Sequence, residues 1–179
     1  GVGFGGSCFP KDVRSLGTML DREGIPSDLV TSVLEVNERQ VEWFLRKIER
    51  ALFTLRGRRI ALFGLAFKPN TDDVRESRAL TIATRLLDEG AIVVAYDPVA
   101  ANNAQRCLPA IEIAPTTLDA CRGAAALILA TEWEEFRRVD WAAIFAVMDQ
   151  PVIFDGRNAL DGRALRALGF EYHGIGRRT

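Results

Sequence analysis

The stretch that decides the fold is RIALFGLAF, residues 59–67. It is a short, continuously apolar run interrupted by a glycine turn at Gly64. A run of this length and composition is typical of a strand buried on both faces of a parallel sheet. In such a sheet, ligands bind at the loop that follows the carboxyl end of a strand. The segment therefore predicts a central strand and, at Phe67 and Lys68, a binding loop.

Downstream of this strand, helical and apolar segments alternate. SRALTIATRLLDEG, residues 77–90, predicts a helix closed by Gly90, and AIVVAYDP, residues 91–98, predicts another buried strand. ALILAT (126–131), PVIFDGR (151–157) and FEYHGIG (170–176) continue the pattern. This alternation predicts the α/β class, with a Rossmann-like parallel sheet that carries helices on both faces.

Upstream of the strand, the pattern is helical. DVRSLGTMLDREG (12–24) stops at a glycine, and SDLVTSVLEVNERQVEWFLRKIERAL (27–52) follows with Ser27 as its predicted N-cap. The second helix carries an apolar stripe over about 25 residues, which is long for one domain. We therefore expect two parts: residues 1–55 as an active-site loop and helical connector, and residues 56–179 as the Rossmann-like domain.

Composition excludes several classes of protein. The 23 Lys and Arg residues balance 24 Asp and Glu residues, which favours neither nucleic acid nor an anionic membrane as partner. No apolar run approaches the roughly 18 residues of a membrane span. Three scattered cysteines give neither a disulfide framework nor a metal-binding pattern, so we expect no metal and a reducing, cytoplasmic setting.

The chain opens with GVGFGGSCFPKD, residues 1–12, a glycine-rich loop that ends in a cysteine. Its glycines match G-x-G-x-x-G, but no strand precedes them and a helix follows, so we reject the dinucleotide fingerprint. A plain flexible loop explains the glycines but not Cys8. Cys8 precedes a predicted helix start, with Pro10 suited to the first turn and Lys11 nearby. That setting favours the nucleophilic thiolate form.

Two long motifs resemble one known family. GFGGSCFPKD (3–12) resembles the active-site loop of the UDP-glucose dehydrogenase family, and ALFGLAFKPNTDDVRES (61–77) is similar to that family's substrate-domain signature. AYDP, TEWEEF and FDGRN follow in the family's order. The resemblance covers essentially the whole chain. It implies the C-terminal portion of a longer enzyme without the family's N-terminal NAD-binding domain, so we expect the isolated chain to be inactive.

The resemblance also implies roles for individual residues. Cys8 matches the covalent nucleophile, and Asp12 matches the acid that activates or orients water; without the resemblance, Asp12 is a first-turn carboxylate that favours the helix dipole. The substrate positions are Gly1, Val2, Gly3, Phe4, Gly5, Phe67, Lys68 and Arg157. The cofactor-side positions are Phe9, Lys11 and Arg75, with Asp72, Asp73 or Glu76 as the ion-pair partner of Arg75. Taken alone, Lys68 and Arg157 would be solvent-exposed surface charges.

The implied activity is the NAD-dependent oxidation of UDP-glucose, in two steps, to UDP-glucuronate. An aldehyde needs an added nucleophile before it can lose a second hydride, and Cys8 would supply it through a thiohemiacetal and a thioester. Two alternatives stay open: another nucleotide sugar, such as UDP-N-acetylmannosamine or GDP-mannose, or a non-catalytic module for nucleotide-sugar binding and dimerisation. The implied partners are a UDP-sugar and a second copy, which contacts the long helix.

The remaining distinctive residues are interpreted as structural. We assign His173, the only histidine, to a strand or edge position rather than to a catalytic base. We expect packing roles for the three tryptophans, Trp43, Trp133 and Trp141. Cys107 and Cys121 are expected to be structural.

Overall fold

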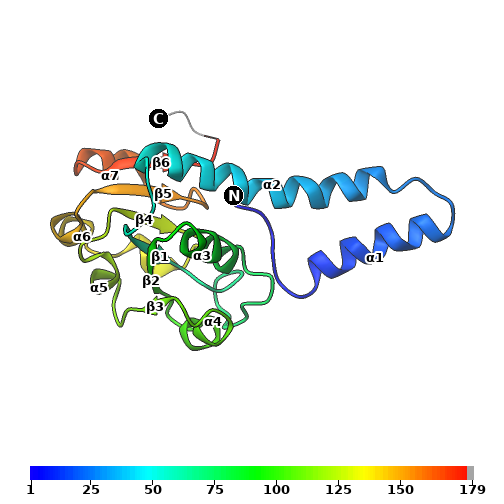
Figure 1. The fold of residues 1–179 in the computed structure, drawn as a ribbon, viewed down its shortest axis with the longest axis horizontal. Coiled ribbons are helices and arrows are strands. Elements are labelled where there is room, and N and C mark those ends of the chain that lie inside the picture. Colours follow the sequence, from blue (N-terminus) through cyan, green and yellow to red (C-terminus); the bar gives the residue numbers. More distant parts are fainter. Residues whose placement is uncertain (177–179) are drawn as a thin grey trace.

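A single parallel sheet lies at the centre of the protein (Figure 1). The computed structural model describes residues 1–176, and within them the sheet has six strands in the order β3-β2-β1-β4-β5-β6. The strands are β1 Arg59–Phe63, β2 Ile92–Tyr96, β3 Glu112–Ile113, β4 Ala126–Leu129, β5 Val152–Asp155 and β6 Glu171–Gly174. The chain changes direction across the sheet between β1 and β4, and a doubly wound sheet binds ligands at that point.

The strand predicted from residues 59–67 is the central strand β1. Ile60 faces Val93 of β2 on one side and Ala126 of β4 on the other, so both edges of β1 are paired. Its apolar side chains are fully buried on both faces of the sheet. The continuous apolar run therefore reflects burial on two faces rather than one.

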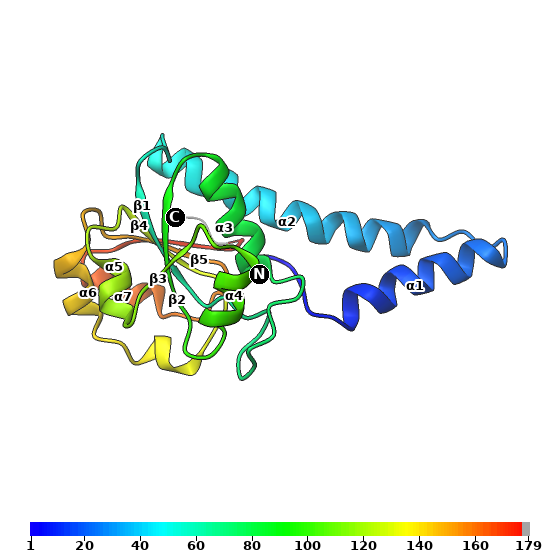
Figure 2. The same ribbon diagram turned by 60° about the horizontal axis from the view of Figure 1, so that its bottom comes forward.

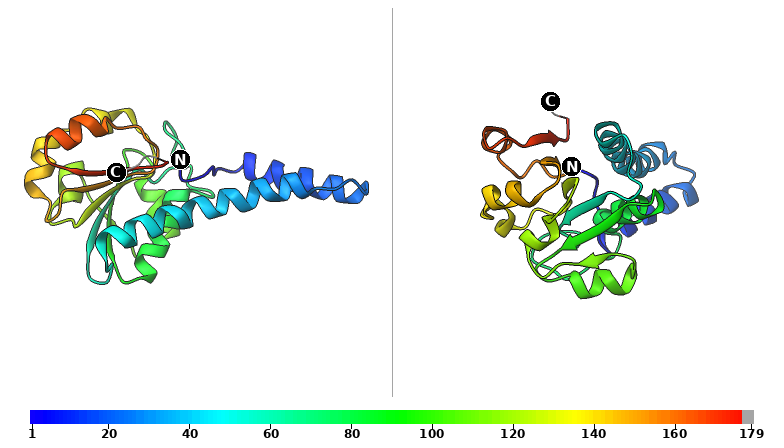
Figure 3. Two further views of the ribbon diagram at one scale, coloured as in Figure 1. Left: turned by 90° about the horizontal axis from the view of Figure 1, so that it is seen from above. Right: turned by 60° about the vertical axis from the view of Figure 1, so that its left-hand side comes forward.

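Helices cover both faces of the sheet, as the alternating pattern predicts. The helices that follow β1 are α3 Arg78–Asp88, α4 Ala101–Cys107, α5 Thr117–Cys121, the 3₁₀ helix η1 Glu134–Arg137, α6 Trp141–Val147 and α7 Gly162–Ala167. The right-hand view of Figure 3 shows α3 on one side of the sheet and α6 and α7 on the other. The fold is therefore an α/β fold with a Rossmann-like sheet.

The first two helices form an arm that extends away from the sheet (Figures 1 and 3). They are α1 Phe9–Arg22 and α2 Asp28–Leu52, joined by a turn at Gly24 with φ +67°. The apolar stripe of α2 has two environments. Its C-terminal half, including Phe44 and Ile48, is buried against the sheet, whereas Leu29 and Val33 near its start are exposed.

The segment before α1 returns the chain to the sheet. The Val2 side chain is fully buried, and the Val2 amide donates to the Gly156 carbonyl after β5 at 3.1 Å. The Gly6 amide donates to the Arg75 carbonyl at 3.0 Å, so the segment also lies beside the loop that follows β1 (Figure 2). The N-terminal glycines thus lie over the carboxyl ends of the strands.

The structure confirms some of the structural assignments and corrects others. His173 lies in the edge strand β6 and stacks on Phe154 at 4.9 Å between ring centroids. Trp133, Trp141 and Cys121 pack in the interior or against it. Trp43 is half exposed on α2, so its predicted packing role was wrong. Cys107 is exposed at the end of α4, where it lines a cavity beside the loop after β1, and its structural role stays a prediction. Over residues 1–176, the helices are too short or too polar to cross a membrane.

Candidate active site

A cavity of about 410 Å³ lies at the carboxyl ends of the strands. It is bounded by the N-terminal glycine segment, the loop after β1 and the loop after β5. Its lining residues are Gly1, Gly3, Phe4, Gly5, Phe9, Asn37, Phe67, Lys68 and Arg157. Eight of the thirteen residues named from the sequence therefore share one cavity. They come from segments more than 150 positions apart in the chain, since Gly3 and Arg157 both line it.

Arg157 supplies one positive charge to this cavity. Its Nε lies 2.7 Å from Oε2 of Glu132, and both atoms are buried. Its Nη1 and Nη2 donate long hydrogen bonds to the carbonyls of Gly3 and Phe67, at 3.5 and 3.4 Å. Glu132 thus fixes one edge of the guanidinium group, and the rest of the group faces the cavity with weakly held donors that can bind a ligand oxygen.

Phe67 and Lys68, from the loop after β1, also line the cavity. Lys68 Nζ lies 5.4 Å from the centroid of the Phe67 ring, within cation–π range. The same ring lies against the glycine segment, because a Cβ placed on Gly6 would stand 2.7 Å from Phe67 Cε2. Gly6 also has φ +90°. Only a glycine fits this position, which explains one of the four glycines that open the chain.

Two buried aspartates shape the loops around the cavity. Asp97, from the AYDP motif, accepts hydrogen bonds from the amides of Leu65 and Ala66 after β1 and from the Trp133 indole. Asp155, from FDGRN, accepts from the Arg157 amide at 2.9 Å and also from Leu160 and Tyr172. Sequence reasoning quoted both motifs but gave these carboxylates no role. Their positions directly after predicted strands were the available signal.

Asn37 is a further cavity residue that sequence reasoning missed. It lies in the apolar stripe of α2, four positions after Val33 and four before Val41, and its side chain is only 4% exposed. An amide at a buried position of an otherwise apolar stripe usually has specific hydrogen-bond partners. Here the partner is the peptide of Phe4. The stripe itself therefore contained the signal.

Cys8 lies at the N-cap of α1, outside the cavity lining. Its side chain is exposed, and Pro10 occupies the first turn of the helix, as predicted. The Asp12 amide donates to the Cys8 carbonyl at 2.8 Å, so Asp12 lies one turn further along the same side of the helix. The Asp12 carboxylate pairs with Lys11 at 3.4 Å. The thiol and this carboxylate thus lie together at the positive end of a helix dipole.

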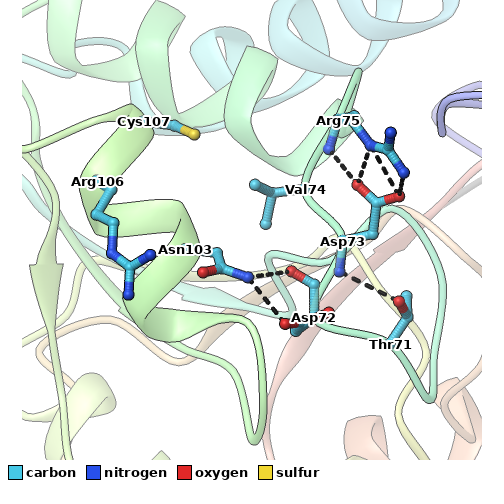
Figure 4. A pocket seen from close by; sticks show the side chains of 8 residues that line it. All are labelled: Thr71, Asp72, Asp73, Val74, Arg75, Asn103, Arg106 and Cys107. Carbon is cyan, nitrogen blue, oxygen red and sulfur yellow. Dashed lines mark hydrogen bonds and ion pairs between the residues drawn. The ribbon is translucent and has the colours of Figure 1, made fainter.

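Arg75 lies at a second cavity, of about 540 Å³, between the loop after β1 and α4 (Figure 4). Its guanidinium group is 69% exposed, and Nη2 contacts Asp73 Oδ2 at 2.7 Å. Asp73 is therefore the ion-pair partner among the three candidates, and the Arg75 hydrogen bond lowers the pKa of the Asp73 carboxyl. Asn103 and Asp72 also hydrogen-bond across this cavity, at 3.0 Å.

The structure therefore separates the thirteen residues into two groups. The positions predicted to bind substrate, except Val2, line the first cavity together with Phe9. Val2 is in the core beneath it, and Cys8, Lys11, Asp12 and Arg75 lie outside its lining. Residues 1–176 contain no group of three or more His, Cys, Asp or Glu side chains arranged to hold a metal ion.

Comparison with known proteins assigns the chain to a family. The UDP binding domain of the UDP-glucose/GDP-mannose dehydrogenase family matches residues 61–162, and the central domain of the same family matches residues 1–39. The chain is 40% identical to UDP-glucose 6-dehydrogenase YwqF of Bacillus subtilis over 180 aligned residues, and 44% identical to UDP-glucose 6-dehydrogenase of Pseudomonas aeruginosa over 185. It spans 41% of the length of each relative.

Solved structures agree with this assignment. A UDP-glucose dehydrogenase from Pyrobaculum islandicum superposes with a TM-score of 0.84 at 33% sequence identity. The superposition covers 99% of this chain and 39% of the Pyrobaculum islandicum chain. A UDP-D-ManNAc dehydrogenase from Pyrococcus horikoshii superposes with a TM-score of 0.80 at 30% sequence identity. This superposition covers 99% of this chain and 40% of the Pyrococcus horikoshii chain. Sequence, fold and cavity agree, and the chain belongs to the UDP-glucose/GDP-mannose dehydrogenase family.

Proposed function

We propose that the protein carrying this chain oxidises UDP-glucose to UDP-glucuronate with two equivalents of NAD⁺. The observation that carries the proposal is the cavity at the carboxyl ends of the strands, where Lys68 and Arg157 place two cations beside aromatic rings. A diphosphate requires cations, and a sugar requires a site with donors and a flat apolar wall. The names of the two relatives above support UDP-glucose as the substrate.

Cys8 is the proposed nucleophile for the second oxidation. Its thiolate adds to the C6 aldehyde, a C–S bond forms, and the oxygen takes up a proton to give a thiohemiacetal. Loss of the C6 hydride and of the hydroxyl proton leaves a thioester. Water then attacks the carbonyl carbon, the C–S bond breaks, and the carboxylate and the thiol are released. Asp12, one turn along α1, orients this water.

The cofactor of the proposed reaction is NAD. When bound, it accepts one hydride in each oxidation. The residues of this chain fit one side of such a site. Lys11 and Arg75 are exposed cations near Cys8, and Phe9 offers an exposed ring. The turn after β1 has a single glycine, Gly64, so the phosphate-binding turn would come from elsewhere in the whole protein.

The proposed organisation has two parts. Residues 1–55 carry the nucleophile and the helical connector, and residues 56–179 bind the UDP-sugar. The connector also supplies the contact between two copies in a dimer, because the start of α2 exposes its apolar stripe. A cytoplasmic location suits the three free cysteines, one of which must stay reduced for catalysis.

A second candidate is the oxidation of a different nucleotide sugar. The Pyrococcus horikoshii structure favours it, since that protein is a UDP-D-ManNAc dehydrogenase of similar fold. The competing ligands share a diphosphate, so the two cations do not separate them. The nucleotide sugars differ in their base and in their sugar, so the protein must distinguish them by its contacts with those two parts.

Direct binding tests both candidates. We expect the native protein to bind UDP-glucose more tightly than UDP-N-acetylmannosamine or GDP-mannose in calorimetric titrations. Arg157→Ala should weaken binding of UDP-glucose by about 1.5–3 kcal/mol and leave NAD binding unchanged, because one charge-assisted contact is lost. Arg163→Ala, at an exposed position of α7, is the matched control. Tighter binding of another nucleotide sugar would favour the second candidate, and an unchanged affinity in Arg157→Ala would remove Arg157 from the site.

A further inference from the structure

The peptide of Phe4 is held on both sides by a single amide side chain. The Phe4 amide donates to Asn37 Oδ1 at 2.7 Å, and Asn37 Nδ2 donates to the Phe4 carbonyl at 3.0 Å. Asn37 therefore pairs with this peptide as a neighbouring strand would, although it lies on a helix. Its burial makes the pairing necessary, because an unpaired amide there would lose its hydrogen bonds to water.

A second side chain binds the same carbonyl. Arg78, the first residue of α3, donates from Nε to the Phe4 carbonyl at 2.8 Å. Its two terminal nitrogens bind the Glu38 carboxylate in a bidentate pair, each at 2.8 Å. Arg78 is largely buried, and the planar fork fixes its Nε toward Phe4. Two adjacent residues of α2 thus hold Phe4. Asn37 binds it directly, and Glu38 holds it through Arg78.

These contacts lie at the middle of the segment that forms one wall of the cavity. Its other backbone anchors are at Val2 and Gly6. Gly3 has φ +105°, and a Cβ there would stand 2.7 Å from Asn37 Oδ1, so the segment fits closely around the amide. The Phe4 ring in turn packs edge-on against Phe9, with centroids 4.6 Å apart. Phe9 directly follows Cys8 in the chain.

We propose that Asn37 and Arg78 are positioning residues for the catalytic thiol. They fix the Phe4 peptide, which sets the cavity wall, and through the Phe4–Phe9 ring pair they set the start of α1, where Cys8 lies. The catalytic part of this inference rests on the proposed function. A leucine at position 37 would continue the apolar stripe but leave the Phe4 amide without its acceptor, so Asn37 both satisfies this segment and fixes its position.

The test compares four forms of the native protein: wild type, Asn37→Ala, Arg78→Lys and the control Arg46→Ala. Arg46 lies on α2 and pairs only with Glu42 on the same helix among the described contacts. Alanine is the better helix former, so Asn37→Ala does not weaken α2 through propensity. Lysine keeps the charge of Arg78 but cannot bind Phe4 and both Glu38 oxygens in one plane.

Three measurements are made on each form: the melting temperature, hydrogen exchange at the Phe4 amide, and turnover to the sugar acid. We expect Asn37→Ala to speed Phe4 exchange by about tenfold or more, because its acceptor is gone. In both variants kcat for acid formation should fall by about tenfold, while KM for NAD stays within about twofold. A purely structural role would lower the melting temperature and leave kcat of the folded protein unchanged, which would overturn the proposal.

Alkylation of Cys8 separates this inference from the proposed function. In a Cys107→Ser background, Cys8 is the one exposed thiol among the described residues, because Cys121 is buried. We expect the rate of reaction with iodoacetamide to differ several-fold from that of wild type in Asn37→Ala and Arg78→Lys, since a displaced helix start changes the position and surroundings of the Cys8 thiol. If wild type forms no sugar acid, the proposed function fails and exchange and alkylation still decide. If the Phe4 exchange rate and the Cys8 alkylation rate stay within about twofold of wild type in both variants, Asn37 and Arg78 do not position Cys8.

Discussion

Gly64 ends the central strand at a point where the chain has no room for a side chain. Its φ is +84°, and a Cβ would stand 2.5 Å from Thr131 Cβ and 2.7 Å from the Thr131 carbonyl oxygen. The Thr131 hydroxyl donates to the Ala66 carbonyl, which holds Thr131 in place beside Gly64. The turn that brings Phe67 and Lys68 to the cavity therefore depends on close contact between the loops after β1 and β4.

Replacement of Gly64 should destabilise the fold more than expected from its positive φ alone, because the new side chain would also clash with Thr131. We expect Gly64→Ala to lower the free energy of unfolding by about 2–5 kcal/mol, from the positive φ and from overpacking against Thr131. Gly57→Ala is the matched control, since Gly57 has φ +72° and no heavy atom within 4 Å of its Cβ position. It should lose only about 1–2 kcal/mol. Equal losses in urea unfolding would show that Thr131 yields to the added methyl group.

Cys8 provides the most direct chemical prediction. We expect Cys8→Ser in the native protein to reduce sugar-acid formation to less than about a tenth, a barrier increase above 1.4 kcal/mol, because a serine hydroxyl is a poorer nucleophile and leaving group. The first oxidation, which needs no thiol, can persist and leave aldehyde. Assays of NADH release and of the acid product distinguish the two oxidations.

The other cysteines provide the controls for this substitution. Cys107 is exposed like Cys8 but lies at the C-terminal end of α4, beside the second cavity and away from the start of α1, so Cys107→Ser should keep full activity. Burial raises the pKa of the Cys121 thiol to about 12, so it stays protonated and unreactive at neutral pH. Acid formation by Cys8→Ser at the level of Cys107→Ser would exclude the covalent role.

Cavity positions were predictable only where a motif carried them. The predicted residues came from the opening glycine loop, the segment after β1 and FDGRN, and the structure brings eight of them together. The partners of those residues were not predictable, because Glu132 meets Arg157 and Asp97 meets Trp133 only after the strands align. Local patterns carry no information about such pairs. Asn37 is the exception, since a polar residue in an apolar stripe can be seen in the sequence itself.

At the scale of elements, an ion pair links α1 to the loop after β1. Pro10 is its single buried residue among those described, and Arg14 pairs with Glu76 after β1 through two hydrogen bonds, at 2.7 and 3.0 Å. The Arg14 guanidinium lowers the pKa of the Glu76 carboxyl below its ordinary 4.5. A carboxyl with a lowered pKa stabilises the folded state above its unfolded pKa and loses that effect as the pH falls through the folded value.

The pair should therefore stabilise at neutral pH and not in acid. Both side chains are more than a third exposed, so we expect a coupling free energy of only about 0.5 kcal/mol at pH 7 in a cycle of Arg14→Ala and Glu76→Gln. The coupling should decline as the pH falls below 4.5 and through the lowered pKa of Glu76, because protonation removes its charge. Arg22→Ala, on the same helix, should show no coupling with Glu76→Gln. A coupling that persists in acid would contradict an ionic origin.

Most elements were predictable because their residues are periodic. Among the described residues, the two long helices and every strand except the short β3 lie where apolar runs or stripes placed them. The strand order was not predictable, because it depends on how each crossover returns to the sheet. The sequence also could not show that α2 buries only half of its stripe. A stripe records that a face is covered, whether by the same chain or by another.

At the scale of the whole molecule, the arm exposes more apolar surface than a solitary arm should. Leu29 is 79% exposed, and Val33 and Val36 are more than 40% exposed on the same helix. With Phe4 and Asn37 they border a groove of about 390 Å³ with almost no polar surface. Leu16, Met19 and Ile25 add exposed side chains on and after α1. Contiguous apolar surface of this kind is typical of an interaction site.

We expect this surface to join two copies of the chain. A charge at Val33 would be buried without a partner in such a contact, so Val33→Glu should weaken dimerisation by about tenfold or more. Val99→Glu is the matched control, because Val99 is also an exposed valine but lies after β2, away from the arm. Sedimentation equilibrium should give a dimer for wild type and Val99→Glu and mainly monomer for Val33→Glu. A monomeric wild type at about 100 μM would show that the arm does not contact a second copy.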